Sequence, residues 1–483
     1  MPESYSNYID GEWVESVTGN TFVVRNPADT NDTIGHFQNS GPKDADRAVE
    51  AASEAQDSWA ATPAPERCAY LTTVAERVEE HKTELAETLT REEGKAIAEA
   101  QPEVRGVAYT CSYFAQVMRE YSCDVKWPSS DDATLSTRRE PLGVASLITP
   151  WNFPIVIPAW KLATALVTGN TVVLKPASNA PNVSRKLFEC LDEAGLPPGV
   201  ANYVTGSGNR VGMPLVEHDD VAAVSFTGSA AVGTSIYETA TQHGKRVQTE
   251  MGGKNPAVVM PSADVGDAVQ IVGAGAFGVT GQACTATSRA IVHKNIYDDF
   301  VAGITDYAAS IEVGPGLEGA DMGPQVTQRE LDTTMEYIRI GESEGATLET
   351  GGSRVTDDGC EDGFFVEPTV FSDVDNEMQI AREEIFGPVL AVIPVADFEE
   401  AVTVANDTKY GLSASIVTDN LREANRFVDQ AETGLVKVNE QTTGTDPHVP
   451  FGGVKQSSSD TYREQGKAGL DFFTTTKTVY KNY

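Results

Sequence analysis

The chain has 483 residues, of which 40% are hydrophobic and 8% are aromatic. This length corresponds to about three domains of ordinary size, and this composition is that of a globular protein. The sequence carries 71 acidic against 36 basic residues, a formal net charge of −35 that repels nucleic acid phosphates and anionic membrane surfaces. It contains no run of about 18 apolar residues and no basic or apolar leader at its start. We therefore expect a cytoplasmic protein without a nucleic acid or membrane partner.

The acidic residues are spread along the whole chain rather than gathered in a tail. This distribution indicates a solvated, carboxylate-rich surface on every domain. Such surfaces resemble those of proteins from extreme halophiles, where salt screens the self-repulsion of the charges. We expect a halophilic protein.

The six cysteines stand far apart and form no CxxC pair, and the six histidines form no HExxH motif. Disulfide frameworks and zinc sites have closer ligand spacings. This pattern predicts no disulfide framework and no metal site.

Helices are expected over 43–121, where apolar residues recur every three to four positions among charged ones. From 143 to 256, β-rich runs alternate with helix-like stretches, which predicts an α/β fold with a parallel, doubly wound sheet. These runs are Val144–Ile148, Thr171–Leu174, Ala201–Val204, Ala222–Phe226 and Arg246–Thr249. A second α/β unit is expected from Asn255 to about Val438.

Two further segments, Ser122–Glu140 and Gly469–Tyr483, fit neither unit because polar and β-branched residues dominate them. Strand-like segments outside a domain core can pair with another chain. We expect them to form an exposed arm that contacts a neighbouring subunit.

One stretch matches the letters of a nucleotide-binding motif but lies in the wrong structural context. Gly273–Gly278 reads GAGAFG and matches GxGxxG, but it follows the helix-like stretch Asp267–Val272, whereas a dinucleotide fingerprint follows a strand. Gly206–Gly212 does follow a strand, but its last spacing is one residue too long, and no GxxxxGK[ST] loop occurs. We assign the small residues of 273–278 to close helix packing.

Six other segments, in order along the chain, carry a more specific signal. They are Thr149–Pro154 (TPWNFP), Lys175–Ser178 (KPAS), Phe226–Ser229 (FTGS), Glu250–Pro256 (EMGGKNP), Gly281–Cys284 (GQAC) and Glu383–Pro388 (EEIFGP). Together they resemble the aldehyde dehydrogenase superfamily, and the resemblance runs from about Tyr8 to the C-terminus.

The resemblance implies a three-part architecture assembled as homodimers or homotetramers. A Rossmann-like cofactor domain would comprise 1–121 and 141–252, and an α/β catalytic domain would comprise 253–450. A β oligomerisation arm would comprise 122–140 and 467–483.

The resemblance also implies that Cys284 is the nucleophile, since a hydride leaves an aldehyde carbon only after a nucleophile has made it tetrahedral. Asn152 would stabilise the oxyanion together with the backbone N–H of Cys284, through an amide that carries no charge to desolvate. Glu250 would activate the water that hydrolyses the thioester. Acylating relatives that use coenzyme A tend to lack this glutamate, so we expect the thioester to be released by hydrolysis.

The resemblance further implies that the protein binds a nicotinamide cofactor. By the family pattern Lys175 would bind the adenosine ribose, Ser229 the pyrophosphate and Glu384 the nicotinamide ribose. The residues that match the family's cofactor site are Trp151, Lys175, Ser178, Gly228, Ser229, Gly233, Glu384 and Phe386, the last beside the nicotinamide ring. Lys175 ends a β-run and Ser229 opens a helix, and helix N-termini attract phosphate.

Ser178 departs from the pattern, because NAD-specific relatives usually have a glutamate there to bind the 2′-hydroxyl. A carboxylate would repel a 2′-phosphate and a serine would not. We therefore favour NADP over NAD.

Two further segments, Lys455–Glu464 and Ile155–Lys161, bear on the identity of the substrate. They resemble the corresponding segments of ketoglutarate semialdehyde (2,5-dioxopentanoate) dehydrogenases of pentose and sugar-acid oxidation. Succinate semialdehyde dehydrogenases commonly carry an arginine where this chain has Trp160. Arg105 and Lys161 are both candidates to bind a substrate carboxylate instead. Succinate semialdehyde and general aliphatic aldehydes remain alternative substrates.

Two other classes compete with this interpretation. A cysteine hydrolase would also use Cys284, but it needs a histidine in reach and a signature such as CGSCW. A non-catalytic binding protein on the same fold is the third possibility, because fold does not imply function. The presence of Cys284, Asn152, Glu250, Lys175 and Glu384 together favours the enzyme.

Overall fold

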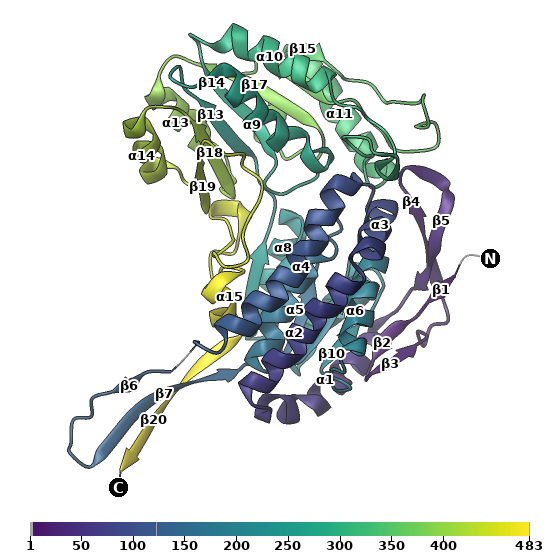
Figure 1. Ribbon diagram of the computed structural model, residues 1–483, viewed down its shortest axis with the longest axis vertical. Coiled ribbons are helices and arrows are strands. Elements are labelled where there is room, and N and C mark those ends of the chain that lie inside the picture. The colour runs from purple at the N-terminus through teal and green to yellow at the C-terminus, as the bar shows by residue number, and fades with distance from the viewer. Residues whose placement is uncertain (1–2, 122, 483) are drawn as a thin grey trace.

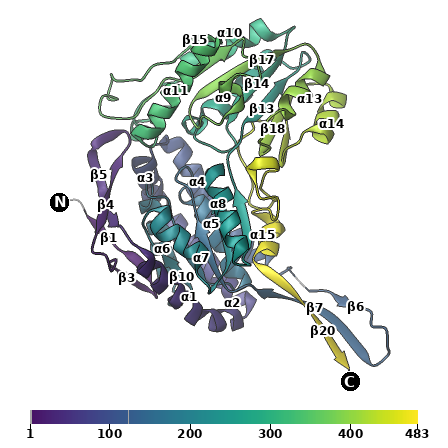
Figure 2. The same ribbon diagram turned by 180° about the vertical axis from the view of Figure 1, so that it is seen from behind.

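The computed structural model describes residues 3–121 and 123–482, which form two α/β lobes and a protruding β arm (Figures 1 and 2). Met1, Pro2, Ser122 and Tyr483, which fall in the predicted cofactor domain and arm, lie outside the described residues. Within the described part of the chain, no helix has the length and apolar character needed to cross a membrane. The fold is α/β with two mainly parallel sheets, as the sequence predicted.

The sheet of the first lobe is parallel except at one edge, where two short N-terminal strands join it antiparallel. Its strands, in spatial order, are β12 (Arg246–Glu250), β11 (Val221–Thr227), β8 (Val144–Ile148), β9 (Val172–Lys175), β10 (Ala201–Tyr203), β2 (Asn7–Ile9) and β3 (Glu12–Val14). A separate three-stranded sheet contains β1 (Ser4–Tyr5), β5 (Asp29–Gln38) and β4 (Thr21–Asn26). The five predicted parallel strands are confirmed to within one residue at each end.

The helices of the first lobe confirm the helical pattern predicted over 43–121 and its continuation between the strands. They are α1 (Pro42–Ala61), α2 (Ala64–Glu80), α3 (Lys82–Glu93), α4 (Ile97–Val117), α5 (Val156–Thr168), α6 (Asn182–Glu193), α7 (Met213–Glu217) and α8 (Ala230–Gln242).

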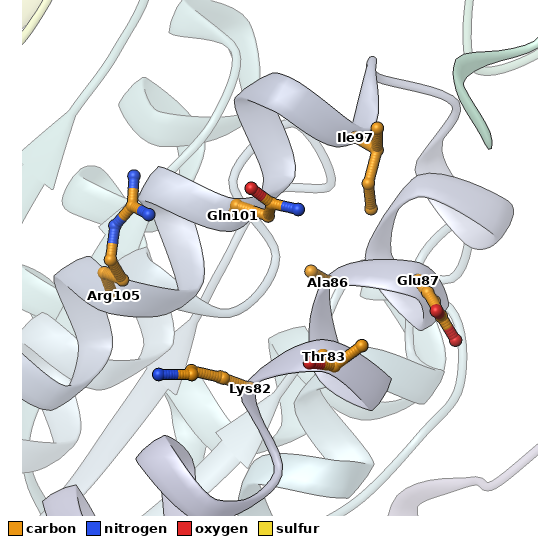
Figure 3. A pocket seen from close by; sticks show the side chains of 7 residues that line it. All are labelled: Lys82, Thr83, Ala86, Glu87, Ile97, Gln101 and Arg105. Atoms are coloured by element: carbon orange, nitrogen blue, oxygen red, sulfur yellow. The ribbon is translucent and has the colours of Figure 1, made fainter. Parts of the chain in front are cut away.

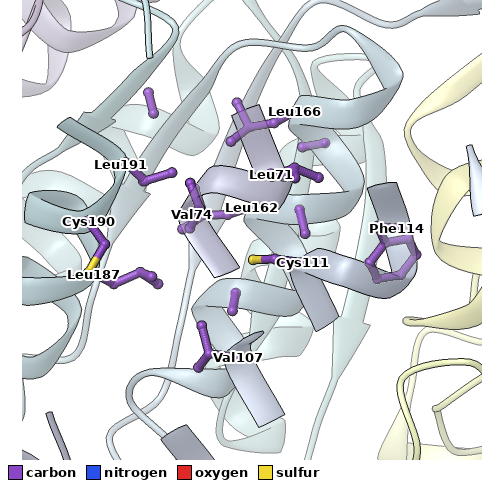
Figure 4. Close-up of a cluster of buried hydrophobic side chains, with 14 of the residues drawn as sticks. Leu71, Val74, Val107, Cys111, Phe114, Leu162, Leu166, Leu187, Cys190 and Leu191 are labelled. Atoms are coloured by element: carbon purple, nitrogen blue, oxygen red, sulfur yellow. The ribbon is translucent and has the colours of Figure 1, made fainter. Parts of the chain in front are cut away.

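Both faces of this sheet are buried, because neighbouring residues of a strand point to opposite faces. Leu147 belongs to the core beneath α2, α4, α5 and α6, whereas Ile148 belongs to the core beneath α1, α7 and α8. Figure 4 shows part of the first core, in which Leu71 and Val74 of α2 face Leu162 and Leu166 of α5. Burial on both faces explains why these strands read as continuous apolar runs.

The strand order of this sheet has a topological switch point between β8 and β11. From β8 the chain winds through β9 and β10 on one side, and then returns to β11 and β12 on the other side. The loops that follow β8 and β11 therefore diverge at the carboxyl edge of the sheet, and open α/β sheets bind ligands in that crevice.

The second lobe repeats the architecture. Its strands, in spatial order, are β15 (Thr347–Thr350), β16 (Thr369–Ser372), β17 (Val389–Val395), β14 (Thr287–His293), β13 (Asn255–Val259), β18 (Ser413–Val417) and β19 (Leu435–Val438). Its helices are α9 (Val265–Phe277), α10 (Tyr297–Ala309), α11 (Gln328–Glu344), α12 (Gln379–Arg382), α13 (Phe398–Asn406) and α14 (Leu421–Gln430).

The GAGAFG stretch lies at the end of α9, as the helix-packing interpretation requires. A Cβ atom on Gly273 would stand 2.4 Å from Cε1 of Tyr307 on α10. Glycine is thus needed at Gly273 for the close approach of two helices.

The arm consists of β6 (Val125–Lys126), β7 (Ala133–Pro141) and β20 (Thr474–Asn482), which pair antiparallel and extend away from both lobes (Figure 1). The prediction of a strand-like tail from Gly469 was wrong at its start, because Gly466–Phe472 forms helix α15. Leu470 and Phe472 are buried in the core of the first lobe, and this burial draws the segment into a helix before the strand begins.

Candidate active site

A cavity of about 320 Å³ opens at the switch point and brings together most of the predicted site residues. It lies between the loops after β8, β11 and β12 and three segments of the second lobe, namely Cys284, the first turns of α11 and residues 384–386. Its predicted residues are Trp151, Asn152, Gly228, Ser229, Cys284, Glu384 and Phe386. Lys175, Ser178, Gly233 and Glu250 are not among its lining residues.

Cys284 lies between a 3-10 turn at Gly278–Gly281 and strand β14, and it is partly exposed to the cavity. Burial, and then the nearby carboxylates of Glu384 and Glu250, raise the pKa of the Cys284 thiol to about 12. The resting thiol is therefore protonated at neutral pH, and it needs a base or a nearby positive charge to become a nucleophile.

Asn152 is buried in the loop after β8 and faces the cysteine loop. Its Nδ2 donates a hydrogen bond of 2.8 Å to the carbonyl oxygen of Gln282. An amide nitrogen carries two hydrogens, so the second remains available to an oxyanion formed at Cys284.

Glu250 ends β12 and is buried, with its carboxylate turned toward the C-terminal loop. Its Oε2 accepts from the backbone N–H of Gly453 at 3.0 Å, and its Oε1 accepts from the Ser458 hydroxyl at 3.2 Å. Burial and the neighbouring Glu464 raise the pKa of Glu250 well above its usual range. A carboxyl group with a raised pKa is a better general base once it is ionised.

A second cavity, of about 580 Å³, reaches the other side of the cysteine loop. Ala283 and Thr285, which flank Cys284, line it together with Phe153, which follows Asn152. Cys284 thus stands between two spaces, one at the switch point of the first lobe and one beside α9 and α10 of the second lobe.

Two residues, Ser229 in the first cavity and Lys175 outside its lining, would fit a dinucleotide. Ser229 is the N-cap residue of α8, and its side chain makes no capping hydrogen bond, so the N–H groups of the first turn are free for an anion. Lys175 is buried at the end of β9, and its Nζ donates to the backbone carbonyls of Pro176 and Gly206. Burial lowers the pKa of Lys175 to about 8, and an anionic partner would restore its charge.

Glu384 and Phe386 form the far wall of this cavity. Glu384 Oε1 accepts from the backbone N–H of Gly253 at 3.1 Å, and a Cβ atom on Gly252 would collide with its carboxylate. Burial raises the pKa of Glu384 to about 7. The ring of Phe386 stands edge-on to Trp151 with 5.4 Å between centroids. A planar ring system could lie between these aromatic side chains and Cys284.

Ser178 and Gly233 lie at the margin of this site. The Ser178 hydroxyl donates to the carbonyl oxygen of Gly206 at 3.2 Å, the same oxygen that Lys175 reaches. Gly233 lies in the first turn of α8, where a Cβ atom would stand 2.5 Å from the sulfur of Met251. The structure therefore explains Gly233 by the packing of α8.

The structure separates the two candidates for a substrate carboxylate from Cys284. Lys161 is buried and pairs with Glu464, so its charge is already neutralised. Arg105 lies in a surface pocket of about 260 Å³ between α3 and α4, together with Lys82 and Gln101 (Figure 3). Neither residue lines the two cavities beside Cys284.

Sequence reasoning missed a set of charged residues around the site, namely the buried Lys95, Glu103, Lys254 and Glu464 and the partly exposed Glu99. Only their burial distinguishes them from surface charges, and a single sequence with many acidic residues carries no signal of it. Among the described residues, no group of three or more His, Cys, Asp or Glu side chains is arranged to hold a metal ion.

The chain is similar to known proteins over nearly its whole length. Residues 13–479 match the model of the aldehyde dehydrogenase family. The chain is 55% identical over the full length of both chains to the alpha-ketoglutarate semialdehyde dehydrogenase of Haloferax volcanii. It is 47% identical to the alpha-ketoglutaric semialdehyde dehydrogenase of Bacillus subtilis, over 99% of this chain and 98% of that one.

Among solved structures, the NAD+ complex of aldehyde dehydrogenase from Bacillus cereus superposes with a TM-score of 0.95 at 36% identity, covering 99% of this chain and 97% of that chain. The match to the family model spans nearly the whole sequence. The chain therefore belongs to the aldehyde dehydrogenase family.

Proposed function

We propose that Cys284 carries the oxidation of an aldehyde to a carboxylic acid in this protein. The supporting observation is its place between the two cavities, with the Asn152 amide beside it. The Cys284 thiol loses its proton to water, and the thiolate attacks the carbonyl carbon to form a carbon–sulfur bond while the carbonyl π bond opens to an oxyanion. The resulting oxyanion accepts hydrogen bonds from the free amide N–H of Asn152 and from the backbone N–H of Cys284.

Trp151, Phe386 and Glu384 would hold a nicotinamide, which would supply the acceptor for the hydride lost from the carbon bound to Cys284. Loss of that hydride leaves a thioester on the cysteine. Glu250 then takes a proton from a water molecule, whose oxygen attacks the thioester carbon. The carbon–sulfur bond breaks, the acid leaves, and the sulfur is freed for another turnover.

We propose 2,5-dioxopentanoate as the substrate and 2-oxoglutarate as the product. The similarity to two relatives named for this semialdehyde supports the proposal. Among the described residues that line the 580 Å³ cavity, none is Lys, Arg or His, so neutral donors such as Gln441 and Thr443 would bind the substrate carboxylate. Succinate semialdehyde and simple aliphatic aldehydes are the alternatives.

NADP is the proposed cofactor, because Ser178 is small and neutral beside the buried Lys175. NAD+ is bound in the Bacillus cereus relative and is the alternative. The arm is proposed to join subunits into a homodimer or homotetramer, since Trp127 and Tyr480 on it are 97% and 76% exposed. The cytoplasmic location and the domain boundaries stay predictions.

The proposal is tested by following the absorbance of the reduced cofactor while the purified protein oxidises a panel of aldehydes. Each aldehyde is offered with NAD and with NADP at high salt. We expect the highest kcat/KM for 2,5-dioxopentanoate, and we expect Cys284→Ala to fall to less than about a hundredth of the wild-type rate with cofactor affinity retained. A Cys284→Ala protein that still turns over, or a wild type inactive on every aldehyde, would overturn it.

A further inference from the structure

We propose that the start of α4 is a positioning device that holds the two loops of the oxyanion site in register. Its members are Lys95, Glu99 and Glu103, which we call the α4 clamp. Glu99 and Glu103 are four residues apart, so they lie on one side of α4, and Lys95 lies just before its N-cap residue, Ala96. This inference rests on the proposed roles of Asn152 and Cys284.

Lys95 holds the loop that carries Asn152. Its side chain is fully buried, and its Nζ donates to the carbonyl oxygen of Asn152 and to Oε2 of Glu103, each at 2.6 Å. The same Nζ lies 4.2 Å from the ring centroid of Phe153. A cation that binds the main chain of Asn152 and the ring of the next residue restricts how that loop can turn.

Glu103 extends this hold to the following helix. Its Oε1 accepts from the backbone N–H groups of Ile155 and Val156, both at 3.3 Å, where α5 begins. The loop from Asn152 to Val156 is therefore bound by both side chains of one buried ion pair.

Glu99 holds the cysteine loop from the same helix. Its Oε1 accepts from the backbone N–H of Val279 at 2.6 Å. Val279 and Thr280 have φ angles of +52° and +56°, which is rare and costly for β-branched residues. A strained backbone persists only where its surroundings determine it, and Glu99 is one such contact.

The two loops meet at the hydrogen bond from Asn152 Nδ2 to the Gln282 carbonyl oxygen. The α4 clamp thus binds one loop through Lys95 and Glu103 and the other through Glu99. Buried ion pairs contribute little to net stability compared with apolar packing of the same shape. Precise placement of the oxyanion donors is the benefit that this arrangement provides.

A double-mutant cycle separates positioning from general stability. We expect Lys95→Met to lower kcat/KM by about 10- to 100-fold, as a displaced catalytic group would. In the Asn152→Ala background the same change should cost less than about threefold, because the donor that it positions is gone. Lys245→Met is the matched control, since Lys245 also binds backbone carbonyls, of His218 and Val221, away from the site.

Equal losses in both backgrounds would overturn the α4 clamp, because they would show that Lys95 acts through stability alone. If Asn152→Ala by itself loses no activity, the proposed function of Asn152 fails instead, which is a distinguishable result. Glu103→Gln is run through the same cycle, so that a Lys95→Met protein that does not fold still leaves the proposal open to refutation. Additive losses in this variant would equally overturn it.

Discussion

Asn152 Nδ2 donates to the carbonyl oxygen of Gln282, two residues before Cys284, at 2.8 Å. An amide nitrogen carries two hydrogens, so this bond leaves one for an oxyanion formed at Cys284. We expect Asn152→Ala to lower kcat by about 10²- to 10³-fold, the usual cost of losing one oxyanion donor. Steady-state kinetics at saturating aldehyde and cofactor measure this, and a loss below about tenfold would contradict the role of Asn152.

The raised pKa of Cys284, about 12, predicts slow alkylation of the free protein. Because the thiolate is the reactive form, the rate with iodoacetamide should rise about tenfold per pH unit from about pH 7 to pH 10 without a plateau. The exposed Cys123 also reacts, so the rate of Cys284→Ala is subtracted as background. A plateau near neutral pH would show that another group stabilises the thiolate.

Glu250→Gln is expected to separate the two halves of the reaction. Thioester formation survives and its hydrolysis fails, so a pre-steady-state burst of reduced cofactor precedes slow turnover. Burial and Glu464 raise the pKa of Glu250, so the wild-type steady-state rate should rise with pH as this carboxyl ionises. The variant should lose that rise. Disappearance of the burst would mean that Glu250 acts before the thioester.

Ser178→Glu is expected to shift cofactor preference toward NAD. A carboxylate about 4 Å from a 2′-phosphate repels it by a few kcal/mol in a partly screened site, and each 1.4 kcal/mol is about tenfold in affinity. The kcat/KM with NADP should fall at least about tenfold, while that with NAD is spared or improved. Both cofactors are measured in wild type and variant at fixed high salt, and an unchanged ratio would remove Ser178 as the selectivity element.

The net charge of −35 predicts that folding and activity need molar salt. At low ionic strength the Debye length grows from about 3 Å at 1 M to about 30 Å at 0.01 M, and surface carboxylates repel over longer distances. Circular dichroism and activity are followed while salt is removed by dialysis, and salt is then restored to test reversal. A folded, active protein in dilute buffer would contradict the halophilic interpretation.

Local sequence patterns were sufficient to predict much of the fold and of the candidate site. The parallel strands could be predicted because apolar runs alternate with helical periodicity, and the resemblance rested on short contiguous motifs around Asn152, Glu250 and Cys284. Each of those motifs can be recognised from a few contiguous residues. The start of β20 could not be placed in the same way, because α15 forms where Leu470 and Phe472 reach a core built from other parts of the chain.

Tertiary structure alone decided how the site is held. Lys161 and Glu464 are 303 residues apart and form a buried ion pair, and Lys95 reaches Asn152 across 57 residues. In the sequence these are ordinary charges among many, because burial and partnership arise only when distant segments pack together. The sequence by itself therefore determined the fold class, the family resemblance and the candidate catalytic residues. Packing decided which charges lie in the dry interior and hold those residues in place, because a desolvated charge persists only where other segments supply its partners.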